Sequence, residues 1–223
     1  YYLYLYIFLN TVKKVQRTKS SNFILNFRKP NFELVADVLY WLTLRYDPRA
    51  NLSDDIEDEK NIINGKYCGS IFDLIENIPQ DLLFTDTFYH FHGDFILDNI
   101  ICTNNSYKLI DWREDFGKEL YLGDMYYDLA KLRHNIIFNH DNINNDLFEI
   151  NIINENEISV DLKCNYLLIK QLEDFDKFIL EKNLNLKKIK LLTSLIWLNM
   201  SPLHEYHISK FLFYFSKFNL FNI

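Results

Sequence analysis

The segment from 92 to 111 contains acidic and amide side chains at a spacing that suits phosphoryl transfer. Asp94 precedes Asn99 by five residues, and Asp111 follows the run YKLI. Phosphoryl transfer needs a carboxylate that orients or deprotonates the attacking hydroxyl, and oxygen ligands that hold Mg²⁺ against the phosphates. Asp94 fits the first requirement, and Asn99 and Asp111 fit the second. The spacing therefore predicts a site for phosphoryl chemistry.

A small β-hairpin is needed to bring these side chains together. The residues NIICT at 99–103 and YKLID at 107–111 favour two short strands, and Asn104 and Asn105 favour a turn between them. Each residue also has an ordinary structural interpretation, such as a turn for Asn99. The joint spacing is what favours a functional site over these separate interpretations.

Three motifs resemble those of the aminoglycoside phosphotransferase and choline kinase family, whose fold is protein-kinase-like. They are HGDFILDN at 92–99, LIDW at 109–112 and GDMYYDLA at 123–130. The resemblance implies an α+β protein-kinase-like fold, mainly the α-rich C-terminal lobe with a small catalytic hairpin and with the N-terminal lobe largely missing. It also implies an enzyme that uses ATP and Mg²⁺ to phosphorylate a hydroxyl of a small molecule. A looser likeness to members from surface-polysaccharide gene clusters implies a sugar-like acceptor.

The resemblance also implies a role for each motif residue. Asp94 would be the catalytic base, or would orient the acceptor hydroxyl. Asn99 and Asp111 would be Mg²⁺ ligands. His92 would hold the loop against the metal-binding segment, and Asp128 would anchor the catalytic loop by accepting hydrogen bonds from its backbone.

Two other patterns compete with this assignment. Asp115 begins a literal DFG, the tripeptide of protein kinases, but it lies four residues beyond Asp111 and past the strand end. We therefore assign the metal role to Asp111. In a strand, His90, His92 and Asp94 would share one face and could bind a single metal, as in metal-dependent hydrolases of the HxHxD type. That alternative gives no role to Asn99.

Hydrophobic periodicity predicts a mainly helical chain around the hairpin. We expect helices at the residues listed next, and Asp124 as the cap of the helix that carries Met125 and Leu129. The ranges are 32–46, 66–78, about 160–182, 186–200 and a final helix containing Phe211. The predicted organisation is an N-terminal remnant or linker over 1–30 and a kinase C-terminal lobe over 31–223.

Glycine is scarce, and its distribution bears on nucleotide binding. The chain has 5 glycines, none before Gly65. A glycine-rich loop that covers nucleotide phosphates is therefore not encoded upstream of the motifs, and no lysine there is a clear phosphate ligand. This leaves open an alternative in which the chain is a truncated or inactive pseudokinase that only binds.

Charge and cysteine content exclude several classes of protein. Lys and Arg number 24 against 31 Asp and Glu, a net charge of −7 that disfavours nucleic-acid binding. The 3 cysteines form no disulfide framework, which favours a reducing compartment. The apolar run 1–9 is shorter than the roughly 20 residues that span a bilayer. We expect a cytoplasmic protein whose partner is a small hydroxyl compound, without a membrane or nucleic-acid partner.

Overall fold

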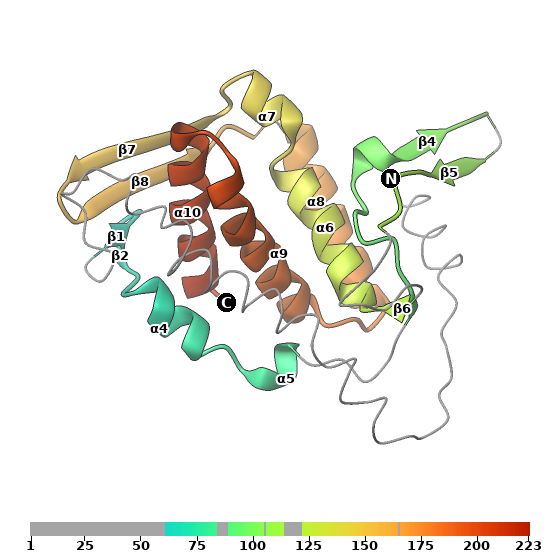
Figure 1. Cartoon of the computed structure of the whole chain (residues 1–223), viewed down its shortest axis with the longest axis horizontal. Coiled ribbons are helices and arrows are strands. Elements are labelled where there is room, and N and C mark those ends of the chain that lie inside the picture. Colours follow the sequence, from blue (N-terminus) through green and yellow to red (C-terminus); the bar gives the residue numbers. More distant parts are fainter. Residues whose placement is uncertain (1–60, 84–88, 105, 114–121, 165) are drawn as a thin grey trace. The chain divides into compact units, whose positions relative to one another are not determined.

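The computed structural model describes residues 61–83, 89–104, 106–113, 122–164 and 166–223 (Figure 1). The described residues form two compact units that are interleaved in sequence. The first unit takes its described residues from 80–137 and 165–192, and the second from 34–79, 138–164 and 193–223. Helices and strands are mixed in both units. The predicted boundary between residues 30 and 31 lies outside the described residues.

The first unit carries the predicted hairpin. Strands β4 and β5 pair antiparallel, with Ile100 opposite Leu109, which confirms the two short strands expected there. Strands β3 and β6 form a second antiparallel pair. The elements are α5 (Gln80–Leu83), β3 (Tyr89–His90), the 3-10 helix η4 (Leu97–Asn99), β4 (Ile100–Cys102), β5 (Tyr107–Leu109), β6 (Leu122–Gly123), α6 (Met125–Ile137) and α8 (Tyr166–Glu181).

Helix α6 is the central support of the first unit. It begins where predicted, because the Asp124 carboxylate accepts the backbone N–H of Tyr126 at 2.9 Å. Its apolar side chains at helical spacing are at most 5% exposed, and α8 packs beside it (Figure 1). Arg133 of α6 binds Asp176 of α8 through Nε at 3.0 Å and Nη2 at 3.3 Å, so the two helices are also joined by a two-point ion pair.

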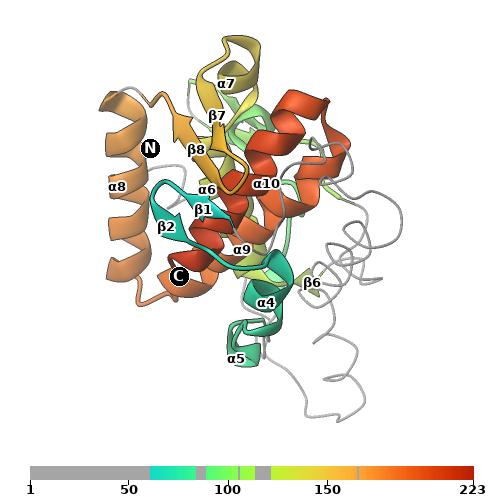
Figure 2. The same cartoon turned by 90° about the vertical axis from the view of Figure 1, so that its left-hand side faces the viewer.

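The second unit is built on a four-stranded sheet of order β2-β1-β8-β7 (Figure 2). Strands β1 and β8 are parallel, and the other two pairs are antiparallel. Helix α10 packs against β7 and β8, and also against α4. The elements are β1 (Ile62–Ile63), β2 (Lys66–Tyr67), α4 (Ile71–Glu76), α7 (His140–Asn144), β7 (Phe148–Asn154), β8 (Glu157–Leu162), η5 (Ser201–Leu203) and α10 (Tyr206–Phe221); α9 (Leu186–Met200) has residues in both units.

Aromatic rings fill the core of the second unit. Phe211 lies 4.8 Å from Phe148, 5.3 Å from Phe138 and 5.0 Å from Phe215, measured between ring centroids. Trp197 packs on Phe215 at 4.8 Å. Rings of this size dominate the apolar area that a core removes from water. We call these five residues the aromatic cluster.

A side chain extends the pairing of β1 with β8. Asn64 lies just after β1 with a φ of +49°. Its Nδ2 donates to the Val160 carbonyl at 2.9 Å, and its Oδ1 accepts the Val160 N–H at 2.9 Å. The amide thus takes the place of one further residue of strand. We call this pair of bonds the Asn64 clasp.

Several predicted helices need correction. Residues 186–200 and the final helix are helical as predicted. The helix expected over 66–78 is shorter, because β2 occupies its start and Gly69, with a φ of +67°, separates β2 from α4. The helix expected over 160–182 begins only at Tyr166, because residues 157–162 form β8. Among the described helices, none is both long and apolar enough to cross a membrane.

Candidate functional site

The predicted loop at 92–99 is held by a carboxylate buried in α6. The Asp128 side chain has no exposed surface. Its Oδ2 accepts the N–H of His92 at 2.7 Å, and its Oδ1 accepts the N–H of Gly93 at 2.8 Å. Burial raises the pKa of Asp128 to about 7, although these two bonds act in the opposite direction. The anchoring role expected of Asp128 agrees with this geometry.

Gly93 permits a close approach between the loop and the segment after β5. Its φ is +81°, and a Cβ built on it would lie 2.6 Å from Cβ of Arg113. The Arg113 N–H donates to the His92 carbonyl at 2.9 Å, which joins the same two segments. A residue with a side chain could occupy this position only if the backbone moved.

The ring of His92, the first residue of the loop, packs against the segment after β5. It is 1% exposed, and its ring centroid is 4.7 Å from that of Trp112. Its Nδ1 accepts the Asp94 N–H at 3.3 Å, so the neutral ring carries its proton on Nε2. Burial lowers the pKa of His92, against the opposing effects of the Ile110 backbone and the carboxylates of Asp94 and Asp111.

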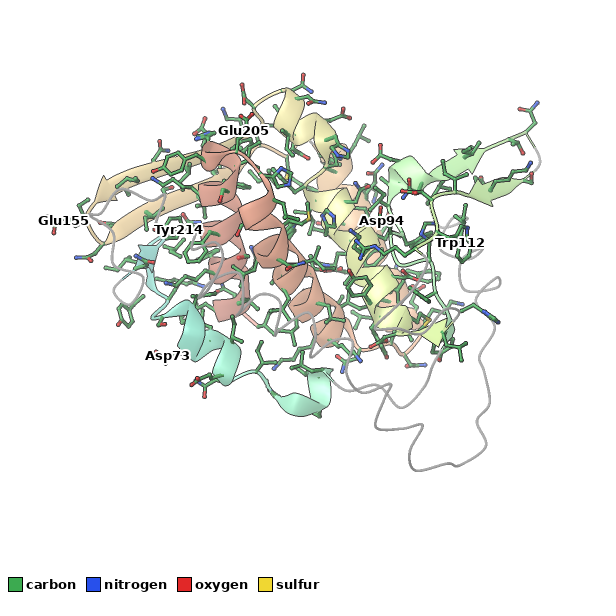
Figure 3. The ribbon with its side chains drawn as sticks, viewed as in Figure 1. Asp73, Asp94, Trp112, Glu155, Glu205 and Tyr214 are labelled. Atoms are coloured by element: carbon green, nitrogen blue, oxygen red, sulfur yellow. The ribbon has the colours of Figure 1, made fainter. Side chains whose placement is uncertain are left out.

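Asp94, the predicted catalytic residue, takes part in an ion pair. Its Oδ1 lies 2.7 Å from Nζ of Lys131, a residue of α6. Asp94 itself is labelled in Figure 3. Its Oδ2 accepts Nδ2 of Asn99 at 3.2 Å, and its own carbonyl accepts the same amide at 2.9 Å. Burial would raise the pKa of Asp94, but the hydrogen bond and charge of Lys131 outweigh it and the pKa is lowered. The carboxylate is therefore ionised and already paired.

Asp111 is placed by the end of β5. It is exposed and has a φ of +58°, a left-handed conformation that aspartate tolerates better than most residues. The neighbouring Ile110 donates its N–H to the Asn99 carbonyl at 3.1 Å. The three predicted residues Asp94, Asn99 and Asp111 are thus brought to connected segments of one unit, as the hairpin predicted.

One face of α6 holds polar residues that the sequence interpretation missed. Lys131 reaches Asp94, and Asn135 accepts the N–H of Leu97 at 3.0 Å and donates to Asp98 at 3.4 Å. With Asp124 and Asp128 they follow a spacing of four, three and four residues, which is one helical face. We call Asp124, Asp128, Lys131 and Asn135 the polar stripe. The helical periodicity of these four residues was the sequence signal that could have identified them.

The base of the polar stripe is closed by a buried ion pair. Lys188 Nζ lies 2.7 Å from Oδ2 of Asp124, and the two side chains are 4% and 1% exposed. The same ammonium lies 4.8 Å from the centroid of the Tyr126 ring. Removing either partner of an ion pair that is this deeply buried would leave the other charge buried and uncompensated, which is strongly destabilising.

The alternative metal site at 90–94 is not formed. His90 is exposed, whereas His92 is buried, so the two rings do not share one environment. Among the described residues, no group of three or more His, Cys, Asp or Glu side chains is placed to hold a metal ion. The hydrolase alternative is therefore not supported. The Asp115 alternative lies outside the described residues.

Comparison with known proteins finds similarity to another family over part of the chain. A family model described as Clusterin-associated protein-1 matches residues 23–64. Clusterin-associated protein 1 of Mus musculus is 53% identical over 36 residues, which are 16% of this chain and 9% of that protein. The Homo sapiens protein is 47% identical over 100 residues, 45% of this chain and 24% of the relative. No solved structure matches.

These similarities correct the functional predictions. The relatives found are Clusterin-associated proteins and not aminoglycoside phosphotransferases, so the family assignment is wrong. The predicted ATP-dependent kinase activity and the predicted small hydroxyl acceptor are wrong as well, because the relatives are named for an association with clusterin. The pseudokinase alternative gains no support either. The kinase-like fold and the roles of the site residues stay predictions.

The chain spans about a quarter or less of the length of these two relatives, with shares of 9% and 24%. The matched residues 23–64 lie before the polar stripe and the loop that it holds, and nearly all of them lie outside the described residues. The described site is chemically an internal network: a buried carboxylate that accepts two N–H groups, and an ion pair that fixes the loop.

Proposed function

We propose that this chain acts by binding another protein through the segment 23–64, with clusterin as the first partner to test. The single observation that carries the proposal is the match of this segment to Clusterin-associated protein-1. Relatives at 47–53% identity carry a name that states an association with clusterin. Binding, rather than chemical turnover, is the activity that this name describes.

The contacts in the first unit are compatible with a binding protein. The Asp94 carboxylate is engaged by Lys131 and Asn99. The Asp128 carboxylate is consumed by two backbone N–H groups. These acids hold a loop in place, a task that any well-ordered scaffold requires, and no transfer step has to be invoked to account for them.

The experiment is a titration of purified clusterin into the full chain by isothermal calorimetry. A variant with residues 23–60 in scrambled order keeps length and composition, and it should lose the binding heat. The matched control is Asp94→Asn, which changes the loop network and should bind as the unaltered chain does. Binding that survives scrambling, or that depends on Asp94 instead, would contradict the proposal.

A second proposal concerns Mg²⁺, which we infer binds beside η4 through oxygens of Asp94, Asn99 and Asp111. Carboxylate and amide oxygens are suitable donors for this ion. The observation that favours it is the pairing of Asp94 with Asn99 at 3.2 Å, next to the segment that carries Asp111. Lys131 would have to share or release Asp94 when the ion binds.

Titration of MgCl₂, and separately of ATP with Mg²⁺, tests this second proposal. Asp111→Asn should weaken Mg²⁺ binding severalfold, because it removes a charged ligand. Asp81→Asn, at an exposed acid of α5, is the matched control and should leave binding unchanged. Equal affinity in both variants would mean that any bound Mg²⁺ lies elsewhere. ATP stays a prediction, which the second titration decides.

A further inference from the structure

Within the described part of the chain, strand β7 lies at an edge of the sheet in the second unit (Figure 1). Among the described strands, β8 is its single neighbour. The strand is seven residues long, and Ile152 and Ile153 are 45% and 59% exposed. Natural sheets usually protect such an edge with lysine, proline or a very short strand. The sequence FEINIIN contains neither lysine nor proline, so the edge is suited to pairing.

Backbone contacts around β8 establish which groups of β7 face this edge. The Ile158 carbonyl accepts the N–H of Asn64, and the Val160 N–H donates to the side chain of Asn64. The backbone N–H and C=O groups of even-numbered residues of β8 therefore face β1. The backbone N–H and C=O groups of odd-numbered residues of β8 therefore face β7. Their partners Glu149 and Asn151 point back at β8. Because successive residues alternate, the N–H and C=O of the remaining strand positions point outward. These positions are 148, 150 and 152.

The outward groups and side chains are self-complementary. An antiparallel pair centred on Ile150 would match Phe148 with Ile152 of a second copy, and Ile150 with itself. Three such matches exchange about six backbone hydrogen bonds. On the opposite face Glu149 would meet Asn151, an acceptor beside an amide donor, so no like charges lie directly opposite. Glu149 also forms an exposed ion pair with Lys163 of its own chain.

We propose that β7 pairs with β7 of a second copy of this chain, across a two-fold axis through Ile150. The bulge between Ile152 and Asn154 ends the regular ladder, which confines the pairing to 148–152 and stops it from extending. Each copy carries a net charge of −7, so long-range repulsion opposes the encounter. Self-association should therefore strengthen as salt screens the charges.

Sedimentation velocity of the full chain between about 1 and 100 μM, the range expected for a small interface, tests the proposal. We expect a monomer–dimer equilibrium that shifts toward dimer at higher salt. Ile150→Pro removes the central outward N–H without touching a bond to β8, and it should give monomer. Ile150→Val keeps the N–H and is the matched control that should still dimerise. Far-UV circular dichroism checks that both variants fold.

A charge exchange tests the register independently of proline. Asn151→Glu would place a second carboxylate opposite Glu149 of the other copy, and it should weaken the dimer about tenfold or more. Adding Glu149→Lys to that variant restores opposite charges across the pair and should restore association. A chain that is monomeric throughout the concentration range overturns the proposal. So does a dimer that is unaffected by Ile150→Pro or by the charge exchange.

Discussion

The two units hold their central segments by different physical means. In the first unit, the polar stripe of α6 fixes the loop at 92–99 through directional bonds, with Asp128 accepting two N–H groups at 2.7 and 2.8 Å. In the second, the aromatic cluster around Phe211 joins α9, α10 and β7 by non-directional packing. Directional bonds specify one loop conformation, whereas ring packing mainly contributes stability. The two kinds of support should fail in different ways.

The largest effect is expected from the aromatic cluster. Phe211→Ala removes a ring with no exposed surface that contacts Phe138, Phe148 and Phe215, and it should lower the free energy of unfolding by about 4 kcal/mol. The measurement is urea unfolding followed by fluorescence. Phe221→Ala on the same helix is the control, because that ring is 41% exposed. A similar loss in both variants would contradict the cluster's dominance.

Loss of the buried anchor comes next. Asp128→Ala strands the N–H groups of His92 and Gly93 in a dry environment, at an expected cost of about 3 kcal/mol. Hydrogen exchange at these two amides should accelerate. The Phe211 variant should not accelerate exchange at these amides as much for the same loss of global stability. Glu173→Ala, at an exposed acid of α8, is the control and should change neither quantity. Unchanged amide exchange in Asp128→Ala would show that Asp128 does not anchor the loop at 92–99.

Two glycines separate backbone strain from steric overlap. Gly93→Ala combines a positive φ with a Cβ at 2.6 Å from Arg113, and it should cost about 2 kcal/mol. Gly65→Ala has a φ of +74° but open space around the new methyl, so about 1 kcal/mol of backbone strain is expected. Thermal unfolding of both variants gives the difference. If the two losses are equal, the close approach at Gly93 has no energetic weight.

The last prediction is a pH dependence of stability. The folded pKa of Asp128 is about 7, above its ordinary 3.8, so the folded state holds a proton that the unfolded state has released between these values. Stability should therefore fall as pH rises from about 4 to 7, by at most about 1.4 kcal/mol per pH unit. Asp94 acts oppositely: its lowered pKa gives a contribution that is lost as pH falls below about 4. Asp128→Asn should abolish the first trend and leave the second.

Local patterns made part of this structure predictable. The hairpin around Asn104 and the cap at Asp124 depend on a few neighbouring residues, and both are found. β8 was missed although Ile158 and Val160 alternate on its buried face. Its flanks are rich in polar residues, and they masked a period-two signal that only tertiary packing against α10 makes decisive.

The candidate site was predictable in position and not in chemistry. The spacing of Asp94, Asn99 and Asp111 correctly placed them on one loop and hairpin. It could not indicate that Lys131 pairs with Asp94, because a lysine on a helix face is ordinarily solvated. The family assignment failed for a related reason. Short motifs describe a loop geometry, and the match to Clusterin-associated protein-1 lies elsewhere in the chain.

The Asn64 clasp has a consequence for the order of folding. It joins residues separated by 96 positions, whereas β7 and β8 are connected by a tight turn and can pair at once. Closing a long loop costs more entropy than closing a short one, and contacts distant in sequence form late. We therefore expect the β7–β8 hairpin to form first, and the Asn64 clasp to attach β1 to it late in folding. An amide side chain can perform this step because two hydrogen bonds secure the strand with a single residue.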